Sequence, residues 1–250
     1  MTKQPLLSTA GLKLGYGAAT IVDDVDFQLN PGDVFAVVGH NGSGKSTLIK
    51  TLLGTLPPLA GLLDWPLGKP KTIAFLGQRS EFDSRFPIRV KDLAAMGAWS
   101  SMGLLGRIDR ECQKRIDQAL ERTGISDIAD LPLYKLSAGQ LQRALFARTM
   151  VQDAYLILLD EPFTAIDQTT EAALLELIDE WAKEGRTIIL VLHDLSAVLQ
   201  HCNSSLLLGN GCALFGEPQK VLTPDNLVAL GYLPQSQADW IEAMYTGAGR

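Results

Sequence analysis

Short apolar runs of strand length recur along the chain and are separated by more polar segments. The runs 34–38, 155–159 and 187–192 are apolar at almost every position, which is typical of strands buried on both faces of a sheet. The stretches 12–16, 25–29 and 73–76 also favour strands, the first two in an N-terminal sheet. The pattern therefore predicts an α/β fold.

Helical spacing of apolar side chains follows several of these predicted strands. In the stretch 109–123, apolar and small residues fall at helical intervals along one face. We expect further helices over 48–53, 137–150, 169–184, 218–222 and 224–231, and a closing hairpin with strands over 205–208 and 212–215. Residues 82–150 then form a helical insertion in the α/β core, whereas the pattern assigns no role to residues 233–250 or so.

The loop after the first buried run has the pattern of a phosphate-binding P-loop, G-x-x-x-x-G-K-S, between a strand and a helix. Its glycines let the backbone close around an anion, and the N–H groups at the start of the helix favour negative charge. The Lys45 side chain can reach the β- and γ-phosphates, and the Ser46 hydroxyl can ligate Mg²⁺. The expected nucleotide-binding residues are Gly39, His40, Asn41, Gly42, Ser43, Gly44, Lys45, Ser46 and Thr47.

Polar residues directly follow three of the other predicted strands. These residues are Gln78, the pair Asp160-Glu161, and His193. The carboxyl ends of strands are where α/β sheets bind ligands. Asp160 can hold Mg²⁺ through water, Glu161 can orient and deprotonate an attacking water, and His193 can contact the γ-phosphate.

Two further candidates are weaker. Ser137 is a good helix N-cap, and with Gly139 it offers a hydroxyl and N–H groups to an anion, although a simple capped helix is the commoner explanation. Tyr16 stands 23 residues before Gly39. Its ring can stack on an adenine or belong to the core, and the spacing alone leaves both open.

Composition narrows the class of protein. A chain of 250 residues suits one large α/β domain or two small ones, and its net charge of −6 argues against nucleic acid as a partner. The three cysteines match no disulfide framework, so we expect a reducing compartment and buried apolar cysteines rather than a metal site. The N-terminus lacks the apolar stretch of a signal peptide, and no apolar run approaches 18 residues. We therefore expect a soluble protein of the cytoplasm, and a position on a membrane partner stays open.

Taken together, the segments resemble the ATP-binding cassette (ABC) ATPases over about residues 8–232. The motifs stand in the family's order: the Walker A loop at 39–47, the Q-loop at Gln78, the signature at 136–140, Walker B at 155–161, the D-loop at 164–167 and the switch histidine His193. Tyr16 then corresponds to the aromatic residue that stacks on adenine. Two positions depart from the pattern: Ala138 replaces the first glycine of the signature, and Gly77 stands where proline is common before Gln78.

The resemblance implies a single ABC ATPase domain over 1–250. Its P-loop NTPase (RecA-like) core carries an N-terminal antiparallel β subdomain and the helical insertion at about 82–150. It also implies an ATPase with the cofactors ATP and Mg²⁺, the metal being held by Ser46, Gln78 and Asp160. Glu161, His193 and Gln78 would be catalytic. Two chains would pair head to tail, so that Ser137, Gly139 and Gln140 serve the nucleotide of the other chain.

A finer resemblance lies in residues 78–81, 86–93 and 96–97, which look like the ATPase subunits of importers for zinc, manganese and chelated iron. The resemblance implies a membrane permease as partner, a second ATPase copy, a solute-binding protein outside the cytoplasm, and a peripheral position on the cytoplasmic face of the membrane. An importer for haem, an iron siderophore or another small solute is the alternative. Whether the second ATPase is an identical chain or a relative stays open.

Two other classes within the family fit the sequence less well. Soluble ABC proteins that act on DNA or ribosomes usually carry two cassettes or a long coiled coil, and this chain has neither signal. A non-hydrolysing regulatory cassette is disfavoured because Lys45, Asp160, Glu161 and His193 are all present. The segment from Gln78 to about Leu105 is rich in glycine, methionine and aromatic residues, so it either docks a permease helix or fills the core of the insertion.

Overall fold

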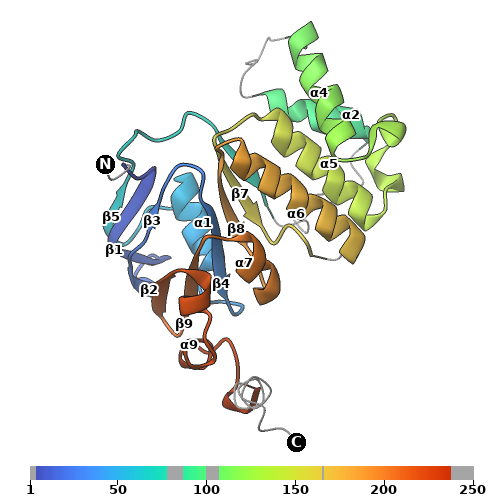
Figure 1. The fold of residues 1–250 in the computed structure, drawn as a ribbon. Coiled ribbons are helices and arrows are strands. Elements are labelled where there is room, and N and C mark those ends of the chain that lie inside the picture. Colours follow the sequence, from blue (N-terminus) through green and yellow to red (C-terminus); the bar gives the residue numbers. More distant parts are fainter. Residues whose placement is uncertain (1–3, 78–86, 100–106, 165, 238–250) are drawn as a thin grey trace, which may run out of the picture. The chain divides into compact units, whose positions relative to one another are not determined.

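Strands and helices are grouped in two units of the chain. The structure is a computed structural model that describes residues 4–77, 87–99, 107–164 and 166–237. One unit combines Met1–Lys69 with Ile189–Arg250, and the other is Pro70–Ile188. Figure 1 labels the elements of both units. The single domain over 1–250, with an insertion at about 82–150, stays a prediction.

An antiparallel sheet forms the N-terminal part of the first unit. Strand β1 (Leu7–Tyr16) pairs antiparallel with β2 (Ala19–Val25), β3 (Gln28–Leu29) and β5 (Ala60–Asp64). Side chains of β1 alternate between buried and exposed at its start, as expected for a strand with one face on the core. The N-terminal antiparallel subdomain is therefore present (Figure 1).

The predicted strand boundaries in this sheet were partly wrong. The stretch 12–16 lies within β1, but the predicted strand 25–29 is broken, because β2 ends at Val25 and only two residues, Gln28–Leu29, form β3. The ladder is already irregular before this break, because the register shifts between the pairs Leu14–Val22 and Leu12–Val25, where Asp24 has φ of +55°. Strand β5 was missed because it is almost wholly exposed and has no apolar alternation to mark it.

The P-loop strand lies in a second sheet of the same unit. Strand β4 (Val34–Gly39), buried at every position, pairs parallel with β9 (Ser204–Gly209), which forms an antiparallel hairpin with β10 (Cys212–Gly216). The hairpin turn is Asn210-Gly211, and both residues have positive φ, as a tight two-residue turn requires. The helices of this unit are α1 (Lys45–Leu53), α7 (Leu195–His201), α8 (Pro218–Val221) and α9 (Pro224–Ala229).

In the second unit, strands β6 (Ile73–Leu76) and β7 (Leu156–Asp160) pair parallel although 79 residues separate them. The regular elements in the described residues between them are all helices, and one isolated bridge, Arg89–Pro132, is the exception. The helices are α2 (Val90–Ala95), η2 (Met96–Ala98), α4 (Arg110–Arg122), η3 (Ser126–Ile128), η4 (Leu133–Lys135) and α5 (Ala138–Val151). Helix α6 (Gln168–Lys183) follows, and β8 (Thr187–Val191) runs across the division between the units.

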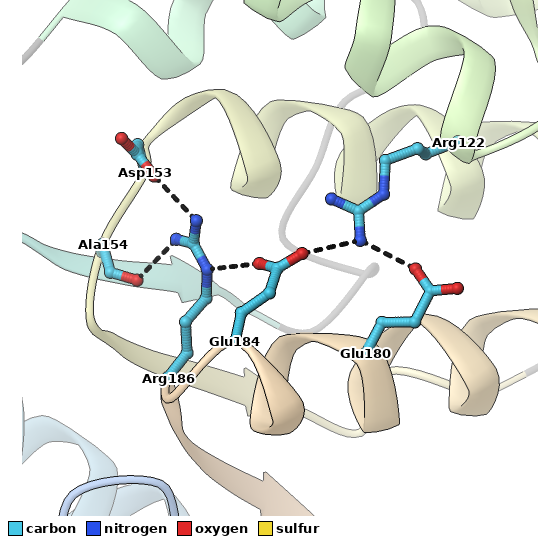
Figure 2. Close-up of polar contacts among 6 residues, drawn as sticks. All are labelled: Arg122, Asp153, Ala154, Glu180, Glu184 and Arg186. Carbon is cyan, nitrogen blue, oxygen red and sulfur yellow. Dashed lines mark hydrogen bonds and ion pairs between the residues drawn. The ribbon is translucent and has the colours of Figure 1, made fainter.

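Packing in the second unit joins the inserted helices to α6. The rings of Phe146 on α5 and Trp181 on α6 stack at 5.9 Å between centroids, and both are buried. Near the C-terminal ends of α4 and α6, Arg122 donates to Glu180 and Glu184 at 2.8 and 3.2 Å. Arg186 donates to Glu184 and Asp153 at 3.1 and 2.8 Å, which completes the ionic cluster in Figure 2.

The prediction that the cysteines are buried is right for two of the three. Cys112 and Cys202 are buried, as predicted, but Cys212 is exposed, because it opens the edge strand β10 next to a surface turn. In the described ranges, no helix is both long enough and apolar enough to cross a bilayer.

Candidate nucleotide-binding site

The P-loop is shaped by glycines that no other residue can replace without strain. Gly42 and Gly44 have φ of +84° and +105°, values that disfavour side chains. Space is a second constraint, because a Cβ on Gly44 would lie 2.5 Å from Cγ2 of Val22, and one on Gly39 would collide with the Ser43 hydroxyl and the carbonyl of Leu208. The loop therefore keeps its backbone bare, which is what close approach of an anion requires.

Lys45 and Ser43 supply the polar side chains inside this loop. Lys45 is only 6% exposed, and its ammonium donates to the carbonyls of Gly39 and His40 at 2.7 and 3.1 Å. The buried Ser43 hydroxyl has no hydrogen-bond partner among the described residues. A buried polar atom without a partner is unusual in a native protein. A phosphate in the loop would give the Ser43 hydroxyl a partner and would add a charged acceptor for the Lys45 ammonium, so these residues fit a nucleotide.

Helix α1 begins directly at the loop without a side-chain cap. Its N-cap is Gly44, and the first turn holds no acidic residue. The first N–H groups of a helix have no partner within the helix, so they add positive potential at this end. Ser46 is exposed in the first turn, where its hydroxyl suits a Mg²⁺ ligand, whereas Thr47 is buried.

Tyr16 lies in the hairpin that borders the P-loop. Tyr16 is the last residue of β1 and pairs with Ala19. Its side chain is 45% exposed, so it is not a core tyrosine. Ile21 and Val22, in β2 of the same hairpin, approach Gly44. The exposed ring is thus carried by the element that packs against the phosphate loop.

His193 follows β8 in a short loop of the first unit. The N–H of the preceding Leu192 donates to the carbonyl of Val37 in β4 at 3.2 Å, so this loop leaves the sheet beside the P-loop strand. Asp194 accepts from the N–H of Ser196 at 2.8 Å and caps α7. The backbone carbonyl of His193 accepts from the hydroxyl of Tyr232 at 2.7 Å. Tyr232 could not be predicted from the sequence, because a tyrosine after a short helix carries no motif.

The acidic pair lies in the second unit, at the carboxyl end of β7. Asp160 is 6% exposed, and Glu161 is half-buried with φ of +50°. Such a conformation costs energy in a residue with a side chain and is concentrated at functional sites. Gln142 of α5 donates to the carbonyl of Pro162 at 2.6 Å, which fixes the turn after Glu161. Gln142 has no distinct sequence signal, since Gln140 and Arg143 are polar residues of the same helix turn.

The signature residues open α5 in the same unit. The Ser137 hydroxyl accepts from the N–H of Gln140 at 3.2 Å, and the Gln140 side chain accepts from the N–H of Ser137 at 2.9 Å, forming a capping box. Ala138 is the first residue of the helix and does not have positive φ, so the missing glycine causes no strain there.

Gly139 lies against the segment that follows the D-loop. A Cβ on Gly139 would lie 3.2 Å from Oγ1 of Thr170. Asp167, the last residue of the predicted D-loop, caps α6 by accepting from the N–H and hydroxyl of Thr170, both at 2.9 Å. These hydrogen bonds, chiefly the one from the Thr170 N–H, lower the pKa of Asp167. The start of the signature helix therefore adjoins the start of α6.

The predicted site residues thus fall into two groups. Tyr16, the P-loop and His193 belong to the first unit, and Asp160, Glu161 and the signature residues belong to the second. Gln78, predicted as a catalytic residue and Mg²⁺ ligand, lies outside the described residues. So do Phe82, Phe86 and Met102 of the predicted docking segment, whereas Trp99 of that segment is 61% exposed.

Comparisons with known proteins agree on the family of this fold and site. The sequence profile of the ABC transporter family matches residues 22–164. A manganese transport system ATP-binding protein of Synechocystis is 34% identical and aligns over 91% of each chain. A zinc transport system ATP-binding protein of Treponema pallidum is 37% identical over 79% of this chain and 76% of its own.

A solved structure shows the same likeness in three dimensions. A metal-chelate type ABC transporter in an inward-facing conformation superposes with a TM-score of 0.83 at 33% sequence identity, covering 92% of this chain and 90% of the other. The predicted fold class is confirmed: a P-loop NTPase core with an antiparallel β subdomain and a helical insertion.

Proposed function

Since the chain belongs to the ABC transporter family, we propose that it is the ATP-hydrolysing subunit of an importer for a divalent transition metal, zinc or manganese. The geometry of the P-loop carries the ATPase part of this proposal. Its two left-handed glycines bare the backbone, and the buried ammonium of Lys45 lies among the loop carbonyls. This combination suits the triphosphate of a nucleotide.

The metal part rests on relatives. The two proteins compared above are named for manganese and for zinc transport, and the likeness extends over most of the chain in both cases. An importer for haem, an iron siderophore or another small solute is the alternative. In either case the subunit works peripherally at the cytoplasmic face of the membrane, with permease subunits, with a second ATPase copy in a head-to-tail homodimer, and indirectly with an extracytoplasmic solute-binding protein. No nucleic acid takes part.

In the proposed reaction, each group of residues has a distinct task. Tyr16 stacks on the adenine, and residues 39–47 hold the phosphates. Ser46, Gln78 and Asp160 would hold Mg²⁺, which would supply positive charge against the phosphates of the nucleotide. Glu161 accepts the proton of the attacking water, and His193 and Gln78 contact the γ-phosphate side of the site. Ser137, Gly139 and Gln140 of the second copy complete the site.

Transport by the complete system tests this proposal. The chain, its permease and its solute-binding protein are reconstituted in liposomes, and ATP-dependent uptake of radioactive manganese and zinc is measured. We expect uptake of one of these metals, and we expect Lys45→Ala to abolish it. Uptake of haem or an iron siderophore, with neither metal transported, would replace the metal by the alternative solute. ATP hydrolysis that never depends on the permease would contradict the coupling.

A further inference from the structure

The loop that carries His193 is held by a residue from a distant part of the chain. The hydroxyl of Tyr232 donates to the carbonyl oxygen of His193 at 2.7 Å, across 39 positions of sequence. The loop is also fixed on either side, since Leu192 is bonded to Val37 of the P-loop strand and Asp194 caps α7. Tyr232 therefore contacts the backbone of the one residue between these two anchors.

The backbone that carries Tyr232 is itself held by hydrogen bonds and close packing. The N–H of Tyr232 donates to the carbonyl of Leu227 at 2.8 Å, which ties the tyrosine to α9. The Asn210 amide donates to the carbonyl of Ala229 at 2.9 Å, and the Leu230 carbonyl lies so close to Gly209 that no side chain fits there. The segment after α9 thus packs against the end of β9, and these contacts fix the backbone position from which the Tyr232 side chain extends.

The phenol is suited to donate at neutral pH. The side chain is half-buried, and this burial, aided by the charge of Asp194, raises the pKa of Tyr232 above its usual value. A protonated hydroxyl is needed here because the partner, a backbone carbonyl, can only accept.

We propose that Tyr232 is a positioning residue for ATP hydrolysis, because its hydroxyl fixes the His193 carbonyl and so limits how the exposed imidazole turns toward the γ-phosphate. The proposal rests on the proposed role of His193. Tyr232 touches neither nucleotide nor water in this role. It acts through the peptide group of the residue that does.

Tyr232→Phe tests the hydroxyl alone, since the ring and its packing remain. Loss of one hydrogen bond that orients a reacting group should lower kcat for ATP by roughly fivefold. The KM for ATP and the affinity for a fluorescent ATP analogue should stay at the wild-type values, because the P-loop is unchanged. Tyr134→Phe is the matched control: Tyr134, on η4 and outside every motif named above, is 60% exposed, and its hydroxyl has no hydrogen bond within the described residues, so kcat should not change.

A double variant separates positioning from a merely structural role. In a His193→Ala background, measured by sensitive single-turnover hydrolysis, Tyr232→Phe should have no further effect, because the imidazole that it orients is gone. Circular dichroism fixes a temperature at which every variant is folded, and all rates are compared there. A fivefold loss that persists in the His193→Ala background, or a rise in KM with unchanged kcat, would overturn the proposal.

The outcome also distinguishes this inference from its premise. If His193→Ala hydrolyses ATP at the wild-type rate, the proposed role of His193 fails, and the role of Tyr232 fails with it. If His193→Ala is slow while Tyr232→Phe is as fast as wild type, only the positioning role is wrong.

Discussion

Helices α1 and α5 both begin at a turn rich in serine and glycine, but the two N-termini are built in different ways. At α1 the N-cap is Gly44, and no side chain caps the helix. At α5 the N-cap is Ser137, which exchanges two hydrogen bonds with Gln140. The first N–H groups of α1 have no side-chain acceptor and can bind a ligand. At α5, the Ser137 hydroxyl accepts one of the N–H groups of its own helix.

This difference explains why one motif can be understood from a single chain and the other cannot. Every feature of the P-loop, from its left-handed glycines to the buried Lys45, lies within residues 39–47 and their contacts in one unit. The capping box at Ser137 stabilises α5 by about 1 kcal/mol with no ligand present. In its proposed second role, binding the nucleotide of another copy, Ser137 would use a hydroxyl that already accepts a hydrogen bond from Gln140.

The largest expected effect comes from removing the proposed general base, Glu161. We expect Glu161→Gln to keep ATP binding and to lower turnover by roughly 10²–10⁴-fold, as for loss of a general base. Glutamine tolerates the left-handed backbone of residue 161 about as well as glutamate, so the fold should be retained. Steady-state hydrolysis measures the loss, and gel filtration with ATP should show a trapped dimer. A near wild-type rate would remove Glu161 from the role of base.

A matched pair of glycine substitutions tests the contrast between the termini directly. Gly44→Ala places a Cβ at φ of +105° and 2.5 Å from Val22, so the free energy of unfolding should fall by about 1–3 kcal/mol and ATP affinity should fall with it. Gly139→Ala has no such φ and meets Thr170 at 3.2 Å, so the isolated chain should keep its ATP affinity and most of its stability. Denaturant unfolding and equilibrium ATP binding measure both. Equal losses of ATP affinity in the two variants would contradict the contrast.

Mixing two inactive variants tests whether Ser137 serves another copy. Chains with Ser137→Arg are mixed with chains that carry Lys45→Ala. In a mixed head-to-tail dimer both changes fall on one composite site and leave the other site intact. ATPase activity should therefore rise above that of either variant alone. If mixed dimers form, as shown by differently tagged chains, and activity never rises, Ser137 does not act on the nucleotide of the other copy.

The same contrast sets the limit of what the sequence could predict. The buried strands β4, β7 and β8 were predicted because nearly every residue in them is apolar, and the P-loop because its spacing reflects backbone needs. Strand β5 could not be predicted, since its pairing with β1 is set by tertiary contacts and its side chains are exposed. The left-handed backbone of Glu161 and the contact of Tyr232 with His193 also depend on the folded chain and leave no local pattern.

The smallest expected effect concerns Asp167, which caps α6 beside the signature glycine. Hydrogen bonds from Thr170 lower the pKa of its carboxyl in the folded chain below the ordinary value of 3.8. The stabilisation that this carboxylate contributes is therefore complete above about pH 4 and is lost as the pH falls through its folded pKa. Asp167→Asn keeps an oxygen that can cap the helix but removes the titration. The variant should be slightly less stable than wild type at pH 7, and the difference should shrink below pH 4. Denaturant midpoints of both chains, measured from pH 7 down to pH 3, test this. A gap that widens on acidification would mean that the Asp167 carboxylate does not stabilise the start of α6.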